Sequence, residues 1–149
     1  MVEFTIVLLI LLVLVFGIIE FGLLMKDYLT LGHAAREGAR SASLGSPTGI
    51  VIDRIQKTAS ALSGGLPTAD ISLQKSSDGG TTWGPLGDTG GSPNENNAST
   101  GQMLRVKLTY HHQLVAGGIM PFHGDAQGKV NIAGNMVMRR ETTAPPPTP

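Results

Sequence analysis

The stretch from Val2 to Met25 reads VEFTIVLLILLVLVFGIIEFGLLM and decides the fold of this 149-residue chain. Almost every residue in it is apolar, so a helix of this sequence is apolar on all sides. At about 1.5 Å per residue such a helix is roughly 35 Å long, enough to cross a hydrocarbon core of about 30 Å. Because only a helix can hide its backbone polar groups there, the stretch predicts a helix held in lipid or surrounded by protein.

Two carboxylates interrupt this apolar stretch. Glu3 stands at its start, and Glu20 follows about 25 Å further along the axis and about 100° around it, so the two cannot pair with each other. A carboxylate in an apolar helix is costly unless it is paired, and it usually marks function. We interpret Glu3 as a docking charge for the α-amino group of a neighbouring chain, and Glu20 as a residue at the membrane surface near Lys26.

Three other kinds of segment fit the apolar stretch less well. A cleaved signal peptide needs a basic start, a shorter apolar run and a small-x-small cleavage site, none of which precedes Lys26. A buried core helix is disfavoured by the length and by the apolarity on every side. A plain single-span membrane anchor remains the main alternative.

The helix is expected to continue beyond the apolar stretch. Residues 26–44 read KDYLTLGHAAREGARSASL, and proline does not occur before Pro47. One helix from Val2 to Leu44 would be roughly 65 Å long. Small residues at i, i+3, i+4 and i+7 form a stripe that lets another backbone approach closely. These candidate helix-packing residues are Ala35, Gly38, Ala39 and Ala42.

Residues 46–141 are expected to form a small α+β head. A short amphipathic helix is predicted before Gly64-Gly65, with Ile50, Ile52, Ile55, Ala59 and Leu62 as its apolar residues. Alternating patterns predict strands at residues 70–75, 102–113 and 130–139. In the second of these strands Leu104, Val106, Leu108 and Tyr110 share one face. Three antiparallel strands with one apolar face can pack over the helix.

Two segments of the head region are polar. Residues 76–101 are glycine-rich and form either a display loop or a disordered segment. Within them Asp78-Gly79-Gly80 is a hairpin-turn signal, and Trp83 is expected to fill the small core. Residues 142–149 form a proline-rich tail, which either lies extended along a neighbouring subunit or is disordered. The domains are therefore 1–45 for the helix, 46–141 for the head and 142–149 for the tail.

Composition and motifs disfavour catalysis. The formal net charge is zero and basic residues do not cluster, which argues against nucleic acid as a partner. Cysteine is absent, and nucleophile and phosphate-loop motifs are absent too. The conceivable metal ligands are His111, His112, His123 and Asp125, but adjacent histidines of a strand point to opposite faces. We expect no enzyme activity, metal or cofactor. Asn97 lies in an N-x-S glycosylation sequence, a possible modification site.

Three motifs together resemble a known family. VEF at residues 2–4, GIIEFG at 17–22 and AAREGAR at 34–40 are similar to the TadE-like pilins of tight-adherence pili, within the type IV pilin superfamily. VNIAGNMVMRRE at 130–141 resembles the closing strand of that family. The apolar run lacks the proline that the family often carries, so a proline-linked kink is not available here.

The resemblance implies a structural subunit whose helices assemble into an extracellular filament for adhesion. It implies residence in the inner membrane before assembly, cleavage of a leader by a prepilin peptidase, and contact with the pilus assembly machinery and with copies of the chain itself. By the same resemblance Glu3, Phe4 and Glu20 are the candidate residues for assembly and subunit register. The alternative is a monomeric, membrane-anchored surface domain, or a minor pilin that primes a filament of another subunit.

Basic residues after the span set one further expectation. Lys26, Arg36 and Arg40 follow the apolar stretch, and the positive-inside tendency would place them in the cytoplasm. A head on the outer side therefore predicts stronger basic residues upstream, in a leader that precedes this sequence.

Overall fold

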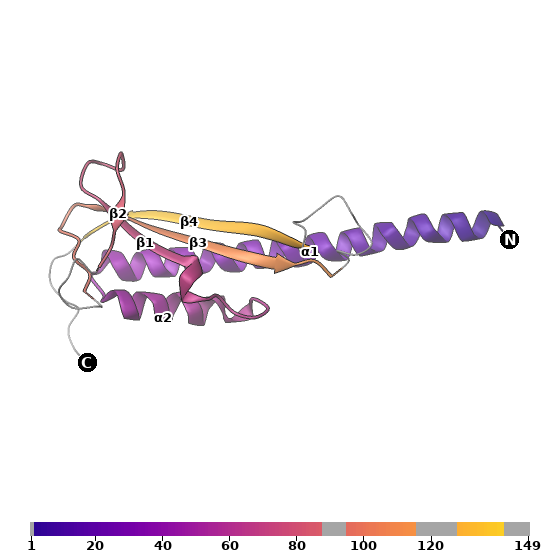
Figure 1. Cartoon of the computed structure of the whole chain (residues 1–149), viewed down its shortest axis with the longest axis horizontal. Helices are drawn as coiled ribbons and strands as arrows, with labels where there is room; N and C mark the ends of the chain where they lie inside the picture. The colour runs from indigo at the N-terminus through magenta and orange to yellow at the C-terminus, as the bar shows by residue number, and fades with distance from the viewer. Residues whose placement is uncertain (1, 88–94, 116–127, 142–149) are drawn as a thin grey trace.

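One long helix runs the length of the molecule, and its second half carries a small head (Figure 1). The computed structural model describes residues 2–87, 95–115 and 128–141. The head contains a second helix and an antiparallel sheet, which is the predicted α+β architecture. In chain order the elements are α1 (Val2–Ser43), α2 (Thr48–Thr58), the 3-10 turns η1 (Ala59–Ala61) and η2 (Thr68–Asp70), β1 (Ile71–Ser76), β2 (Gly84–Pro85), β3 (Met103–Gln113) and β4 (Lys129–Arg139).

Helix α1 ends one residue before the predicted boundary. Gly45 has a φ of 91°, in the left-handed region that glycine adopts without strain. The Gly45 amide donates to the Ala42 carbonyl at 3.0 Å, and the Ser46 amide donates to the Ser41 carbonyl at 3.2 Å. These two bonds make a Schellman cap, which satisfies carbonyls at the end of the helix.

Helix α2 packs beside α1, and its predicted apolar face is confirmed at Ile55 and Ala59 but begins at Val51 rather than at Ile50. Val51, Ile55 and Ala59 are fully buried and lie four residues apart, whereas Ile50 is 49% exposed. The shift arises because Ile55 sits against α1 and fixes the rotation of the helix. Val51 and Ile52, four and three residues before Ile55, then lie on the side that faces α1 and are buried and partly buried, whereas Ile50 lies five residues before it and is exposed.

The sheet has four strands in the order β2-β1-β3-β4, and every neighbouring pair is antiparallel. Three strands were predicted, and the additional strand is β2, whose Gly84 and Pro85 pair with Lys75 and Gln74. Two residues are too short to produce a recognisable alternation. Pro85 lacks an amide hydrogen, which restricts it to the edge of a sheet.

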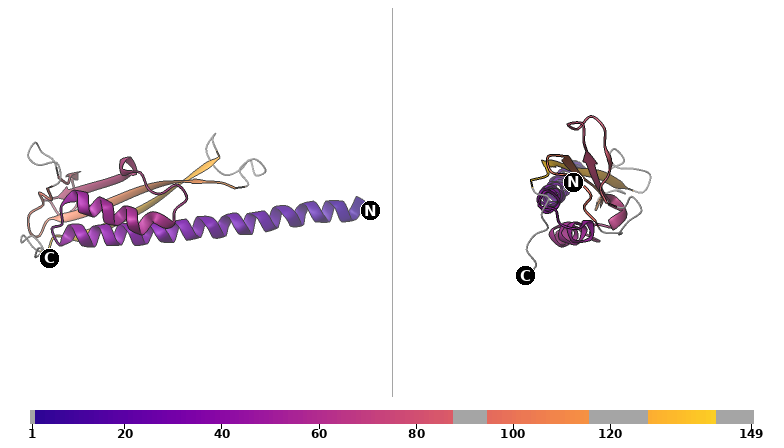
Figure 2. Two further views of the ribbon diagram at one scale, coloured as in Figure 1. Left: turned by 90° about the horizontal axis from the view of Figure 1, so that it is seen from below. Right: turned by 90° about the vertical axis from the view of Figure 1, so that its left-hand side faces the viewer.

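The core lies between the sheet and the two helices, and the predicted apolar face of β3 forms its centre (Figure 2). Leu104, Val106 and Leu108 are fully buried, as the alternating pattern predicts. Strand β4 also packs closely against α1: a Cβ on Gly134 would lie 3.0 Å from Cγ of Leu31. A glycine is therefore needed where the strand crosses the helix.

Trp83 is not part of the core, contrary to the prediction. Its ring is half-buried and stacks against Arg105, whose guanidinium carbon lies 4.1 Å from the ring centroid. The Arg105 Nε also donates to Oε1 of Gln74 at 2.7 Å. Leu86, three residues later, is buried in the core instead. Trp83 thus finds a cation–π partner, which is worth about 0.5–1 kcal/mol at an exposed site.

Candidate assembly helix and its junction with the head

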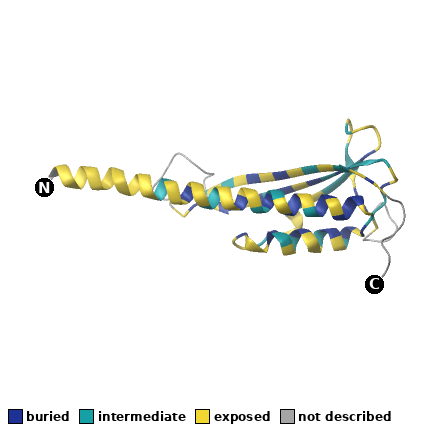
Figure 3. Cartoon of the chain, turned by 180° about the vertical axis from the view of Figure 1, so that it is seen from behind, coloured by how far each residue is buried: buried dark blue, intermediate teal, exposed yellow. Residues whose placement is uncertain are grey.

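The first half of α1 projects from the head and exposes apolar side chains on all sides (Figure 3). Phe4 is 71% exposed and Leu9 is 66% exposed. Helix α1 is long and apolar enough to cross a membrane, with a mean hydropathy of 3.0 over its most apolar window. Water is a poor solvent for such a surface, so this part of the helix requires lipid or other helices around it.

The structure separates the three residues predicted to set subunit register. Glu3 and Phe4 lie exposed near the free end of α1. Glu20 lies far from them and is only 8% exposed, because the end of β3 covers it. Its partners are described below and belong to the same chain. A register role therefore stays a prediction for all three residues, and the structure shows in addition that Glu20 has contacts within its own chain.

Glu20 accepts hydrogen bonds from the end of β3. Its Oε1 lies 3.3 Å from Nε2 of His112. The backbone amide of Val115 donates to both carboxylate oxygens, at 3.2 and 3.0 Å. Glu20 is therefore buried against its own chain, and its position at a membrane surface stays a prediction. Its cost of burial is offset by partners that lie more than ninety residues away in the sequence.

Asp27, which lies two helical turns after Glu20 on α1, contacts the same histidine. Its Oδ2 lies 2.7 Å from Nδ1 of His112, and its residue is 4% exposed. Nζ of Lys26 lies 3.7 Å from the other oxygen of Asp27 and donates to the carbonyl of Ala61 at 3.0 Å. Because both nitrogens of His112 face carboxylate oxygens, both donate only when the imidazole carries two protons.

Tyr110 completes the surroundings of this junction. Its ring lies edge-on to His112, with the centroids 6.5 Å apart, and its hydroxyl donates to the Ser63 carbonyl at 2.8 Å. Burial, and then the negative charge of Asp27, raise the pKa of Tyr110 above its ordinary value of 10.0. The hydroxyl therefore remains a donor at neutral pH.

The histidines predicted to face opposite ways do so. His112 is buried, whereas His111 is exposed on the outer face of the sheet, with its Nδ1 2.5 Å from Oδ1 of Asn131. His123 and Asp125 lie outside the described residues. Within the described residues, no group of three histidine or acidic side chains is arranged to hold a metal ion.

Sequence reasoning missed the role of His112, although a signal for it exists. The alternation that buries Leu104 to Tyr110 continues for one more step and places His112 on the same face. A histidine on an apolar face needs polar partners. The spacing of Glu20 and Asp27, seven residues apart on one helix, puts two carboxylates on a common face.

The predicted stripe of small residues packs inside its own chain. Ala35, Gly38, Ala39 and Ala42 are all buried, and a Cβ on Gly38 would lie 2.5 Å from Cδ1 and Cγ1 of Ile55. The backbone that approaches this stripe closely is therefore α2. The sequence leaves open which backbone approaches the stripe, and in the structure the head of the same chain covers it.

The far end of α1 is tied to the head by two polar side chains. Nδ2 of Asn96 donates to the carbonyls of Ala42 and Ser46 at 2.8 and 3.1 Å. Arg140, which is 6% exposed, donates from Nη1 to Oδ1 of Asn96 at 2.6 Å. Burial lowers the pKa of Arg140 below its ordinary value. A cation beside the carboxyl end of a helix also complements the helix dipole.

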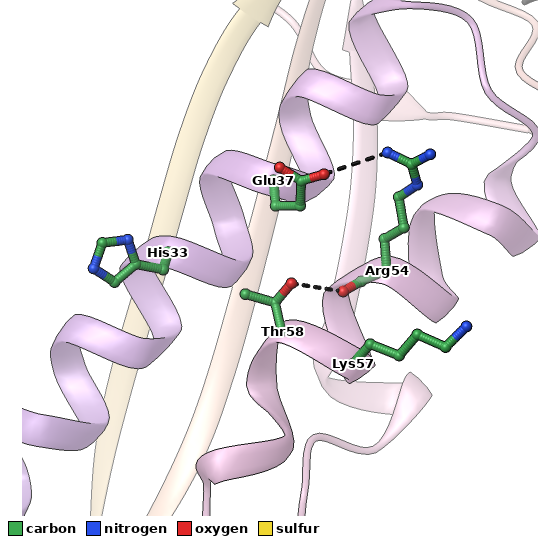
Figure 4. Close-up of a pocket in the computed structure, with 5 residues that line it drawn as sticks. All are labelled: His33, Glu37, Arg54, Lys57 and Thr58. Carbon is green, nitrogen blue, oxygen red and sulfur yellow. Dashed lines mark hydrogen bonds and ion pairs between the residues drawn. The ribbon is translucent and has the colours of Figure 1, made fainter.

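An open groove of about 430 Å³ lies between α1 and α2 (Figure 4). Glu37 and Arg54 form an ion pair across it at 3.3 Å, and Thr58 donates to the Arg54 carbonyl at 2.9 Å. His33 and Lys57 point away from this pair rather than toward a common point (Figure 4). The Glu37–Arg54 ion pair thus links the two helices across the groove.

The possible glycosylation site is engaged in a backbone contact. Oδ1 of Asn97 accepts a hydrogen bond from the Gly87 amide at 3.1 Å, and its carbonyl accepts one from Nζ of Lys75 at 3.1 Å. The residue is half-buried. These contacts stabilise the loop, and modification of Asn97 stays a prediction.

The fold and the projecting helix together define an architecture: an apolar N-terminal helix that carries a small α+β head. In a comparison with protein families, the model of the TadE-like protein family matches residues 1–40, which cover most of this helix. The resemblance predicted from the sequence is confirmed over this segment, where the chain is similar to TadE-like proteins. The match ends before the head, so the resemblance of residues 130–141 stays a prediction. Searches of curated proteins and of solved structures found no match.

Proposed function

We propose that this chain is a structural pilin-like subunit, which assembles through α1 into an extracellular type IV-like filament used for adhesion or surface attachment. The observation that carries the proposal is the projecting half of α1, which is apolar and exposed on every side. The family match covers this same helix. Before assembly the helix is held in the inner membrane, and the prepilin peptidase and the pilus assembly machinery act on the chain there.

The energetics of the helix support transfer from lipid into a filament core. Burying one large apolar side chain is worth about 1.5–3 kcal/mol relative to water. Lipid and a bundle of neighbouring helices both provide that burial, so exchange between them does not expose the helix to water. The head remains the part in contact with solvent, with the outer face of its sheet largely exposed.

Glu3 supplies specificity that apolar burial lacks. Its carboxylate stands at the start of the apolar segment, within the first turn of α1. In a filament core this carboxylate needs a cation beside it. The terminal amine of a neighbouring subunit can pair with it in only one axial alignment of the two helices. Removal of one partner from a buried ion pair costs about 3–5 kcal/mol, because the other charge is left uncompensated.

The test is filament formation by a Glu3→Ala variant of the full chain. We expect membrane insertion to be unchanged and sheared surface filaments, counted by electron microscopy, to fall at least tenfold. Glu3→Asp keeps the charge and should restore a measurable part of the assembly. Glu37→Gln is the matched control, because this carboxylate lies on the same helix but is paired with Arg54.

Two results would decide against the proposal. Abundant filaments from the Glu3→Ala variant would exclude the docking role of this carboxylate. Recovery of the unaltered chain solely in the membrane fraction after shearing would favour the alternative, a monomeric membrane-anchored domain. A chain found at the end of filaments made by another subunit would instead identify a minor pilin.

A further inference from the structure

The junction of Glu20, His112 and Asp27 has a geometry that apolar packing does not require. Two carboxylates on one face of α1 bind the two nitrogens of a single imidazole from β3, at 3.3 and 2.7 Å. All three residues are at least nine-tenths buried. Among the described residues the junction lies where the head begins along α1, because the residues of α1 before Glu20 are mostly exposed and the core contacts begin at Leu24.

The segment of helix between the two carboxylates contains its weakest point. Gly22 lies between Glu20 and Asp27, and no atom lies within 4 Å of the position its Cβ would take. Glycine destabilises the interior of a helix by about 1 kcal/mol relative to alanine. Phe21 and Met25 are exposed beside it, so packing of these side chains does not hold the segment straight. His112 joins the residues on both sides of Gly22.

We propose that Glu20, His112 and Asp27 form a protonation-dependent clamp, which holds α1 straight across Gly22 and fixes the projecting helix relative to the head. With a doubly protonated imidazole, both carboxylates accept a charge-assisted hydrogen bond. With a singly protonated imidazole, one nitrogen presents a lone pair to a carboxylate, and that contact becomes repulsive.

The charges that face His112 fix the direction of the pH response. On α1 they are Glu20, Asp27 and Lys26, the last 3.7 Å from Asp27 and with its side chain 55% exposed. Strand β3 adds the neutral Tyr110, and the Val115 amide donates to Glu20. The positive charges of a doubly protonated His112 and of Lys26 cancel the two negative charges of Glu20 and Asp27. Loss of the imidazole proton leaves a net negative charge in a buried place, so raising the pH opens the clamp.

Opening the clamp frees the helix to bend at Gly22 and changes the angle between anchor and head. The clamp acts within one chain, and it operates whether or not the chain assembles into filaments. It therefore stands or falls independently of the proposed filament function.

The test is a distance between the projecting helix and the head in the purified full chain in detergent micelles. The chain contains no cysteine, so spin labels can be placed at Leu11→Cys on α1 and Ser72→Cys on β1, both exposed positions. Pulsed electron paramagnetic resonance then gives the distribution of the distance between labels. We expect a narrow distribution at about pH 5 that broadens as the pH is raised to about 8.

Variants of the two neighbouring histidines separate the clamp from a general effect of pH. His112→Gln should give a broad distribution at every pH, whereas His111→Gln, on the opposite face of β3, should behave like the unaltered chain. The proposal is overturned if the distribution is independent of pH in the unaltered chain, or if the pH response persists in His112→Gln. The pH series on the unaltered chain does not depend on any variant. If His112→Gln fails to fold, that series alone can still disprove the proposal.

Discussion

At the scale of single residues, Gly38 shows how closely the two helices approach. A Cβ at this position would lie 2.5 Å from two carbons of Ile55, closer than side-chain atoms come in folded proteins. Gly32, on the same helix, has no atom within 4 Å of the corresponding position. The two glycines therefore differ in packing while they share the same helical backbone.

Substitution of these two glycines by alanine should have opposite effects on stability. Gly32→Ala should raise the free energy of unfolding by up to about 1 kcal/mol, because alanine favours the helix. Gly38→Ala gains the same propensity but forces Ile55 to move, and overpacking of this kind costs about 1–3 kcal/mol. Urea unfolding followed by circular dichroism measures both. Adding Ile55→Val to Gly38→Ala should recover part of the loss, and equal effects of the two glycine substitutions would contradict the packing described here.

Asp78 provides a second prediction at this scale, in the turn after β1. Its carboxylate accepts hydrogen bonds from the hydroxyl of Ser76 at 2.6 Å and from the hydroxyl and amide of Thr82. These bonds, led by the one from Ser76, hold the pKa of Asp78 well below its ordinary value of 3.8. Because the pKa of Asp78 is lower in the folded turn than in the unfolded chain, the charged carboxylate stabilises the turn at every pH above its ordinary pKa. This stabilisation is lost as the pH falls through the lowered pKa of the folded state.

The turn should therefore keep its structure in mild acid and lose it only in strong acid. Amide exchange and chemical shifts of Thr81 and Thr82, measured by nuclear magnetic resonance against pH, report on it directly. Asp78→Asn should remove the acid transition and speed exchange of both amides at neutral pH. A transition at the pH of an exposed aspartate would show that the hydrogen bonds do not favour the charged form.

At the scale of elements, the sequence predicts the helices and strands well because each has local signals. The end of α1 follows from Gly45 and Pro47, and the strands β3 and β4 follow from alternation over eleven residues each. The two-residue β2 has no such period. The rotation of α2 was missed because it depends on contact with Gly38, which local periodicity does not contain.

The candidate site was less accessible to sequence reasoning because its contacts are distant along the chain. Glu20 was recognised as unusual, but its partner His112 lies 92 residues away. The stripe of small residues was recognised as a close-packing surface, yet the sequence does not say whether the partner is a second copy or the same chain. The packing of Ile55 against Gly38 answers that question in favour of the same chain.

At the scale of the whole molecule, the head and the projecting helix are structurally separable. The core cluster draws from α1 only residues beginning at Leu24, and the residues of α1 before Glu20 are mostly exposed. The clamp residues Glu20 and Asp27 lie on the head side of this boundary. The head should therefore not depend on the apolar segment for its own stability.

Deletion of residues 1–19 should yield a soluble head that still folds. Its core and the clamp remain complete, and the large exposed apolar surface that requires lipid is removed. Deletion of residues 1–35 is the matched control, because it also removes Asp27 and the fully buried Leu31, Ala34 and Ala35. Loss of a buried leucine side chain alone costs about 2–5 kcal/mol, so this shorter chain should not fold. Size-exclusion chromatography and thermal unfolding distinguish the two chains. Aggregation or a lost unfolding transition after removal of residues 1–19 would mean that the head needs the apolar segment, and with it a membrane or a filament, to fold at all.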